Sequence, residues 1–480
     1  MIKALLVIGA LLLLFITVIL IRTLTFRPVK KTASKVVDGV RVDGDSVVSS
    51  LSQMIRIRTV SSRDKSEEDE GEFKKFEDTL PQLFPLVFEK CDVEKPSDRS
   101  ILIRWRGKSD TAPTVLMAHY DVVSVEADKW EVDAFEGAVI DGYIWGRGVI
   151  DTKGSLNAIL SAAQTLIAEG FTPESDVYFA FGGDEEINGY GASSIVSLFA
   201  ERGIKPSMVL DEGGAVVDDV FPGVKEKCAV VGIAEKGMVN IEYCVTGGGG
   251  HASAPLVDTP VTVLSRAALR ASRAPFRFRV SLPTKMMFDT LGRHSTFAYR
   301  MIFANLGLFT PLLNMLTRRT GGQLNAIART TVAFTKMQGS KGLNVIPPSA
   351  TMASNSRILP GESIESTVNC IERAIGDGRV KIRVINGIEP SGVSTTDCEG
   401  WDRLGAAIGA TWEGAIVSPY LMTACSDSRH WGKISDKVYR FSPFHLTKTE
   451  NSYVHGNNER LPVDKVVCAT EFYIRLMRMS

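Results

Sequence analysis

Histidine and acidic residues in this chain stand where apolar runs end, a position suited to metal binding. The run Val115–Ala118 ends at His119, and Asp121 follows two residues later. Imidazole and carboxylate groups bind zinc, and two zinc ions can share a bridging carboxylate while they hold a substrate oxygen. Five more such residues end apolar runs or stand in glycine-rich turns further along the chain: Asp151, Glu185, Glu186, Asp211 and His455. The set predicts a two-metal hydrolytic site.

Alternating strand and helix patterns predict the scaffold that carries this site. This alternation is typical of an α/β fold with a mostly parallel sheet. In open sheets of this kind, ligands bind at the carboxyl ends of the strands, which is where the candidate metal ligands stand. The first helix is expected over residues 47–59. The expected strands are residues 101–105, 114–119, 175–181 and 208–210, and the helices between them are residues 154–169 and 192–200.

A second pattern, from residue 236 to residue 388, interrupts this catalytic domain. Its elements follow the order βαββαβ, which is the ferredoxin-like arrangement. We interpret it as a lid or dimerisation domain between two parts of the catalytic domain, residues 47–235 and 389–480. The lid elements are strand 238–246, helix 260–272, strands 330–338 and 350–358, helix 362–376 and strand 379–386. Strands 415–422 and 437–441 and helix 462–479 then complete the catalytic domain.

Residues 274–327 form an apolar insertion in the predicted lid, far longer than an ordinary connection. It is rich in phenylalanine, leucine and methionine. Three interpretations are open: extra core for a large domain, a hydrophobic groove for a substrate chain, or contact with a membrane.

The first 31 residues predict a single-pass membrane anchor. Ala4–Ile21 is uncharged and apolar, and its roughly 18 residues are close to the minimum for spanning a bilayer. A cleaved signal peptide is the alternative, but the run ends without a small-x-small site. A basic flank that includes Lys30 and Lys31, and then a polar stalk over residues 32–46, follow the run. The positive-inside rule places the basic flank in the cytoplasm, whereas a luminal or secreted hydrolase requires the reverse, so the side stays open.

Composition excludes other classes of protein. The chain has 55 basic and 55 acidic side chains, so its net charge gives no general attraction to nucleic acid. Its seven cysteines are scattered and include no Cys-x-x-Cys pair, which argues against a disulfide framework and against a cysteine zinc site.

Several short motifs occur together along the chain. They read Ala-His-Tyr-Asp-Val-Val, Trp-Glu-Val, Trp-Gly-Arg-Gly, Asp-Glu-Gly-Gly, Asn-Val-Ile-Pro-Pro and Asp-Ser-Arg. With this combination, the chain from about Val47 onward resembles the dinuclear zinc amidohydrolases and exopeptidases that include aminoacylase, carboxypeptidase S and the DapE desuccinylase. Within that family it is most similar to carboxypeptidase S and the N-fatty-acyl-amino-acid synthase/hydrolase.

The resemblance implies a ligand set for two zinc ions per subunit, with cobalt or manganese as possible substitutes. Asp151 would bridge the two ions, and a cis peptide bond would follow it at Asp151–Thr152. His119 and Asp211 would complete the ligands of one ion, and Glu186 and His455 those of the other.

The resemblance also implies catalytic and substrate-binding roles. Glu185 would act as the general base, and Asp121 would orient the ring of His119. His251 would stabilise the oxyanion, in relatives often from the partner subunit, which allows a homodimer through the lid. Asn344 would approach the scissile carbonyl. Arg357 and Arg429 would hold a substrate carboxylate, because the guanidinium fork binds carboxylates bidentately; each could instead serve as a structural ion pair or cap.

The expected function is zinc-dependent hydrolysis of an amide or peptide bond next to a free carboxylate in a small-molecule substrate. The enzyme would be either a carboxypeptidase S-like exopeptidase or an N-acyl-amino-acid amidohydrolase. A catalytically inactive, membrane-tethered binding protein of the same fold is the alternative. The complete set of expected ligands and the general base argues against it.

Overall fold

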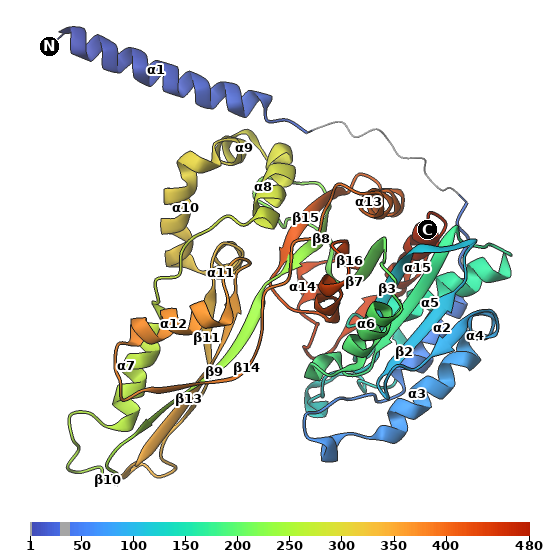
Figure 1. Ribbon diagram of the computed structural model, residues 1–480, viewed down its shortest axis with the longest axis horizontal. Helices are drawn as coiled ribbons and strands as arrows, with labels where there is room; N and C mark the ends of the chain where they lie inside the picture. Colours follow the sequence, from blue (N-terminus) through green and yellow to red (C-terminus); the bar gives the residue numbers. More distant parts are fainter. Residues whose placement is uncertain (1, 29–38) are drawn as a thin grey trace.

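The computed structural model describes residues 2–28 and 39–480. Its main sheet has eight strands in the order β1-β2-β6-β3-β7-β16-β8-β15 (Figure 1). Parallel pairs join β6, β3, β7 and β16, while β1 and β2 add an antiparallel edge. The predicted mixed α/β fold with a mostly parallel centre is confirmed. The strands are β1 (Asp92–Glu94), β2 (Ser100–Trp105), β3 (Ser109–His119), β6 (Ser175–Gly182), β7 (Met208–Val217), β8 (Cys228–Glu235), β15 (Ile416–Met422) and β16 (Val438–Leu446).

Both faces of this sheet are buried under helices. Along β3, Leu116 and Ala118 belong to the largest core cluster, whereas Val115 and Met117 belong to the cluster on the other face. This division follows from the strand geometry, in which successive side chains point to opposite faces. The larger cluster is covered by α2 (Gly44–Ile55), α3 (Glu70–Leu83), α4 (Pro85–Lys90), α5 (Lys153–Ala168), α13 (Glu399–Thr411) and α15 (Val463–Met477), and the smaller by α6 (Gly191–Glu201).

The register of the central strands brings the candidate ligands to one edge. His119, the last residue of β3, is paired with Gly182, the last residue of β6. On the other side, Leu116 of β3 is paired with Leu210 of β7. Because these strands are parallel, the segments that follow Gly182 and Leu210 lie beside His119. A short hairpin, β4 (Val139–Ile140) with β5 (Tyr143–Trp145), pairs with β17 (Arg460–Pro462) and joins the loop before Asp151 to the segment after His455.

The second sheet is antiparallel, in the order β11-β13-β9-β14, and carries α7 and α12 (Figure 1). The chain order β9, α7, β11, β13, α12, β14 confirms the predicted βαββαβ arrangement. Two very short strands, β10 (Gly250–His251) and β12 (Val345–Ile346), pair at its tip. The other elements are β9 (Gly237–Thr246), α7 (Pro260–Ser272), β11 (Thr331–Gln338), β13 (Ser349–Ile358), α12 (Ile364–Ile375) and β14 (Lys381–Ile388).

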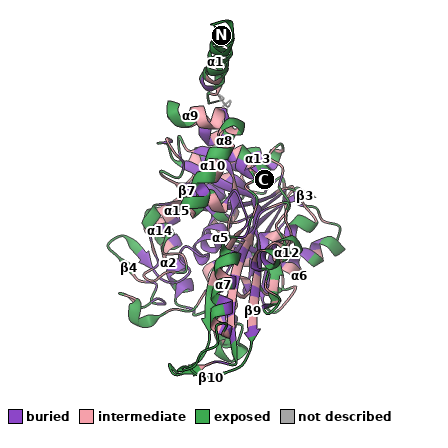
Figure 2. Ribbon diagram, turned by 90° about the vertical axis from the view of Figure 1, so that its left-hand side faces the viewer, coloured by how far each residue is buried: buried purple, intermediate pink, exposed green. Residues whose placement is uncertain are grey.

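The apolar insertion folds into four helices. They are α8 (Leu282–His294), α9 (Phe297–Ala304), α10 (Leu306–Thr320) and α11 (Gly322–Ala326). Helix α8 packs against the edge strand β15, and its Met287, Phe288 and Leu291 belong to a core cluster. The extra-core interpretation therefore holds for α8. It holds only in part for α9 and α10, whose Phe303 and Leu306 pack against the same cluster. The rest of these two helices is half-buried or exposed, and among residues 297–320 only Asn305 and Thr317 are buried (Figure 2).

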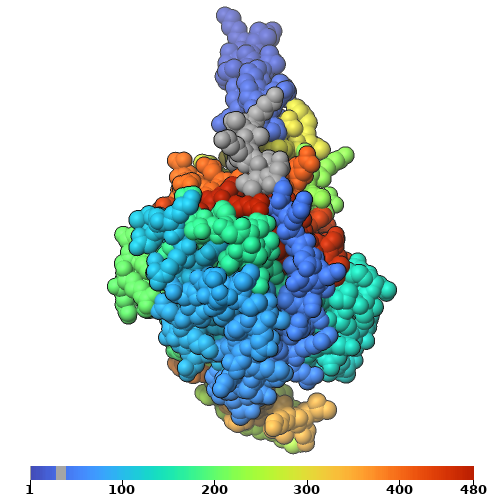
Figure 3. Space-filling model, turned by 90° about the vertical axis from the view of Figure 1, so that its right-hand side faces the viewer, coloured from blue at the N-terminus to red at the C-terminus, as the bar shows by residue number. Residues whose placement is uncertain are grey.

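The first helix, α1 (Ile2–Thr25), projects from one end of the molecule (Figure 3). By length and composition it is apolar enough to cross a membrane, and it is the sole helix of this kind among the described residues. It contacts α9, and the side-chain amide of Asn305, which directly follows α9, donates to the carbonyl of Ile19 in α1 at 3.5 Å. Lys30, Lys31 and residues 32–38 of the predicted stalk lie outside the described residues. The end of the predicted stalk needs a correction, because α2 begins at Gly44, where Asp43 caps it.

Candidate metal centre

Asp151 lies between the two candidate histidines. Its Oδ1 is 2.9 Å from Nε2 of His119, and its Oδ2 is 3.0 Å from Nε2 of His455. The same nitrogen of His455 is 3.1 Å from Oε2 of Glu186. His119, Asp151 and Glu186 could hold one metal ion, because their ligand atoms all lie within 4.8 Å of one another. The peptide bond between Asp151 and Thr152 is cis, as the resemblance implied.

Asp121 fixes both His119 and the turn that carries the paired glutamates. Its Oδ1 lies 3.4 Å from Nδ1 of His119 and accepts a hydrogen bond from the backbone N–H of Glu185 at 3.1 Å. Its Oδ2 accepts from the N–H of Glu186 at 3.1 Å and from the hydroxyl of Ser61 at 2.7 Å. Since Asp121 is fully buried, these contacts hold the histidine ring and both glutamates in fixed relation.

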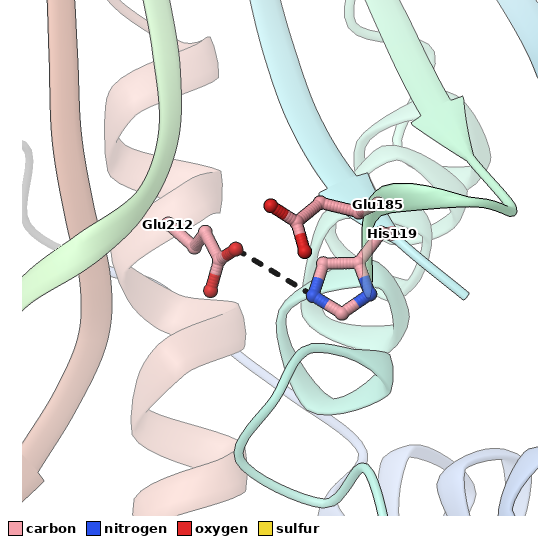
Figure 4. Close-up of side chains that lie close together, drawn as sticks. All are labelled: His119, Glu185 and Glu212. Carbon is pink, nitrogen blue, oxygen red and sulfur yellow. Dashed lines mark ion pairs between the residues drawn. The ribbon is translucent and has the colours of Figure 1, made fainter. Parts of the chain in front are cut away.

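Glu212, which the sequence analysis did not select, lies closer to His119 than the predicted ligand Asp211 does. Oε1 of Glu212 is 3.5 Å from Nε2 of His119, and these two residues with Glu185 form a second group able to hold a metal (Figure 4). Oδ2 of Asp211 instead accepts a hydrogen bond from the backbone N–H of Ser428 at 2.9 Å. Neighbouring residues of a strand point to opposite faces. Glu212 therefore faces His119, whereas Asp211 points towards the loop that contains Ser428.

The segment from His455 to Glu459 closes the far side of the centre. His455 has a positive φ of 57°, which turns the chain at that point, and just over half of its side chain is exposed. Glu459 is fully buried and accepts hydrogen bonds from the guanidinium of Arg147 at 2.8 Å and from the N–H of Gly148 at 3.0 Å and of Ile150 at 2.7 Å. These bonds join the His455 segment to the loop that leads into Asp151. Glu459 is a second residue that the sequence analysis missed.

Burial and mutual repulsion set the charges at this centre. Burial raises the pKa of Glu185 well above its usual range, and the nearby carboxylates of Asp427, Glu212 and Glu186 raise it further. Burial likewise raises the pKa of Glu212 to about 8. Hydrogen bonds from His119 and His455 outweigh burial at Asp151 and lower its pKa. So many buried carboxylates are costly without positive charge, which divalent cations would supply.

The two candidate carboxylate-binding arginines contact one loop. The guanidinium of Arg429 donates to the carbonyl of Ser426 at 2.6 Å and lies 3.5 Å from Asp427. That of Arg357 donates to the sulfur of Cys425 at 3.6 Å. Arg429 also lines a cavity of about 710 Å³. Tyr190 lines the same cavity, together with Met238 of β9 and Asn386 of β14 from the second sheet.

His251 and Asn344 lie together, but away from the metal residues. The N–H of Ala252 donates to the carbonyl of Asn344 at 2.9 Å, and the exposed ring of His251 contacts the hydroxyl of Ser253 at 2.8 Å. Figure 1 places β10, which carries His251, at the far tip of the second sheet, away from β3 and β7 of the main sheet. Within one chain, the structure does not bring these two residues to the centre.

The donor set fits a pair of divalent cations. Two imidazoles face opposite oxygens of one buried aspartate, and glutamates converge from both sides. The sequence pattern of peptidase family M20/M25/M40 matches residues 115–479. The chain belongs to this family.

Named relatives agree with this assignment. A probable carboxypeptidase S-like protein of Dictyostelium discoideum is 35% identical over 436 residues, which cover 89% of this chain and 84% of the relative. An N-fatty-acyl-amino acid synthase/hydrolase of Xenopus tropicalis is 34% identical over 480 residues, covering 98% and 93%. The chain is therefore an M20-family hydrolase of the metallopeptidase type, and the inactive alternative is not favoured.

Solved structures share the fold. An M20 metallo-carboxypeptidase from Sulfolobus solfataricus superposes with a TM-score of 0.65 at 17% identity, over 90% of this chain and 99% of that one. A Bacillus subtilis protein described as a dinuclear metal binding M20 peptidase gives a TM-score of 0.53 at 12% identity, over 90% and 98%. The family depends on a dinuclear metal centre.

Proposed function

We propose that this protein is a dinuclear zinc hydrolase that cleaves an amide or peptide bond next to a free carboxylate. One observation carries the proposal: the two oxygens of Asp151 face two different histidines, His119 and His455. A bridging carboxylate between two cations requires this arrangement. Zinc suits the donors, because imidazole nitrogen and carboxylate oxygen are its ordinary ligands.

Glu185 is the proposed general base. Two zinc ions at the centre would supply a Lewis acid for the amide carbonyl and would lower the pKa of the attacking water. Glu185 lies beside His119 and Glu212 (Figure 4). Its backbone N–H donates a hydrogen bond to Asp121. It takes a proton from the water and later delivers it to the leaving amine. Burial raises the pKa of Glu185, which makes its carboxylate a stronger base for this proton.

Arg429 and Arg357 are proposed to bind the free carboxylate of the substrate. Both contact the loop around Ser426, and Asp427 in this loop is close enough to raise the pKa of Glu185. The cleft lined by Arg429 has room for a side chain or an acyl group. An N-acyl amino acid and a dipeptide present the same amide beside the same carboxylate. The names of the two relatives cover both substrate types, so the proposal includes both.

The tip of the lid supports a homodimer. His251 and Asn344 lie far from the metal residues of their own chain, on an exposed loop. We propose that a second copy places them over the first copy's centre, where His251 would stabilise the oxyanion. We also propose that α1 anchors the protein in a membrane.

Replacing the base tests the proposed function. Glu185→Gln keeps the size of the side chain but cannot accept the proton. We expect turnover of a hydrophobic dipeptide and of a long-chain N-acyl amino acid to fall at least about 100-fold, with two zinc ions still bound. Glu201→Gln, an exposed change at the end of α6, is the control. Undiminished turnover by the Glu185 variant would refute the assignment.

A further inference from the structure

Helix α10 presents an apolar stripe to solvent. Leu308, Leu312, Met315 and Leu316 are 48%, 44%, 46% and 46% exposed. Their spacing of four, three and one residues places them on one face of the helix. In a globular protein such a stripe normally faces the core, as Met287 and Leu291 of α8 do here. The core does not cover this face of α10.

The neighbouring helix extends the same apolar surface. Phe297 and Tyr299 of α9 are 51% and 44% exposed. We call these six side chains, on α9 and α10 together, the α9–α10 face. From Phe297 to Ala326 the sequence has no aspartate or glutamate but contains Arg300, Arg318 and Arg319. An apolar face with only basic charge beside it is typical of helices that lie at the surface of an anionic membrane.

The apolar helix α1 is fixed beside this face. The side-chain amide of Asn305, between α9 and α10, donates to the hydroxyl of Thr23 at 3.4 Å. Arg293 of α8 lies 4.5 Å from the centre of the Phe26 ring and donates to the carbonyl of Arg27 at 3.1 Å. Figure 1 shows α10 crossing the direction of α1, and Figure 2 shows exposed residues of α10 on the side from which α1 projects. A bilayer that holds α1 is therefore next to α10.

We propose that the α9–α10 face lies in the interfacial layer of the bilayer that α1 enters. Lipid acyl chains would cover Leu312 and Leu316, and Arg318 and Arg319 would contact lipid phosphates. The face continues the apolar surface of α1, and this continuity favours lipid over a protein as its occupant. The enzyme would then be held to the membrane at two places, which fixes the orientation of its catalytic centre. This inference rests on the proposed anchoring of α1 in a membrane and is independent of the proposed substrate.

Fluorescence quenching in vesicles tests the proposal with the full chain. Leu312→Cys and Leu316→Cys are labelled with an environment-sensitive dye, in vesicles of phosphatidylcholine and phosphatidylglycerol that carry nitroxide-labelled lipid. Val257→Cys, 93% exposed on the lid, is the matched control, and the labelled parent chain gives the background of the seven native cysteines. We expect quenching at 312 and 316 several-fold stronger than at 257. Equal quenching at all three positions would overturn the proposal.

Two further outcomes separate the sources of contact. A dye at 312 that is shielded from water yet not quenched by lipid nitroxides would mean that protein covers the face, which also overturns the proposal.

Exchanging both arginines, Arg318→Glu with Arg319→Glu, should weaken quenching at 312 in anionic vesicles and leave it unchanged in neutral ones. Lys341→Glu, an exposed change at the lid tip, is the control. Unchanged quenching in anionic vesicles would refute the contact between these arginines and lipid phosphates.

Discussion

Glu459 holds together the two loops that present Asp151 and His455, so its replacement should affect both stability and metal binding. Its carboxylate is fully buried and pairs with Arg147, whose side chain is 3% exposed. Its two oxygens also accept backbone hydrogen bonds from Gly148 and Ile150. Glu459→Gln would remove the charge and turn an amide N–H₂ towards one of these donors.

The size of the effect follows from burial. Breaking a buried ion pair by neutralising one partner costs about 3–5 kcal/mol, because the other charge stays buried without compensation. For a domain as large as the catalytic domain (residues 47–235 and 389–480), such a loss in the free energy of unfolding lowers the thermal midpoint by about 5–8 °C. Metal affinity should fall about 10–100-fold, as it does when groups that orient metal ligands are lost.

Thermal unfolding and zinc titration of the purified chain measure both effects. Glu131→Gln is the matched control, because Glu131 is an exposed acid that contacts the adjacent Asn458. It should change the free energy of unfolding by less than about 0.5 kcal/mol. Arg147→Met combined with Glu459→Gln should cost less than the sum of the single changes, since no charge is left unpaired. If the thermal midpoint of Glu459→Gln lies within about 1–2 °C of the parent, the buried ion pair does not stabilise the protein as argued.

Two further predictions concern the ligand set and the lid. Glu212→Gln should weaken the binding of one zinc ion by at least about tenfold, whereas Asp211→Asn should lower the thermal midpoint and leave the zinc content unchanged. Zinc analysis and thermal unfolding of both variants measure these effects. The reverse pattern would make Asp211 the ligand. His251→Ala and Glu185→Gln chains, each inactive alone, should regain roughly a quarter of the parent activity when coexpressed, because half of randomly formed dimers are mixed and contain one intact site. Activity no higher than that of either variant alone would contradict a site shared between subunits.

Local sequence patterns predicted much of the scaffold. Helix 260–272 has the predicted bounds, because Thr259 caps it and proline stands at its first position. The predicted strand 208–210 is too short: β7 continues to Val217 through Gly213 and Gly214, where the pairing with β16 is irregular. In a sequence, two adjacent glycines indicate a turn, but Gly213 and Gly214 form a β-bulge and remain part of the strand.

Other features depend on contacts that sequence patterns do not contain. No periodicity separates α8, which packs on β15, from α10, which leaves its apolar face exposed, because both helices are amphipathic. The choice between Asp211 and Glu212 depends on which side of β7 faces His119. A bulge shifts that side locally, so the adjacent acids could not be separated before the fold was known. The role of Glu459 likewise depends on a long-range pair with Arg147.

The position of bound zinc tests the central claim most directly. Anomalous scattering from crystals of the zinc-loaded chain, collected on both sides of the zinc absorption edge, locates each ion. The account predicts two peaks, one between Asp151 and His119 and one between Asp151 and His455. A single peak, or peaks that do not share Asp151, would contradict it.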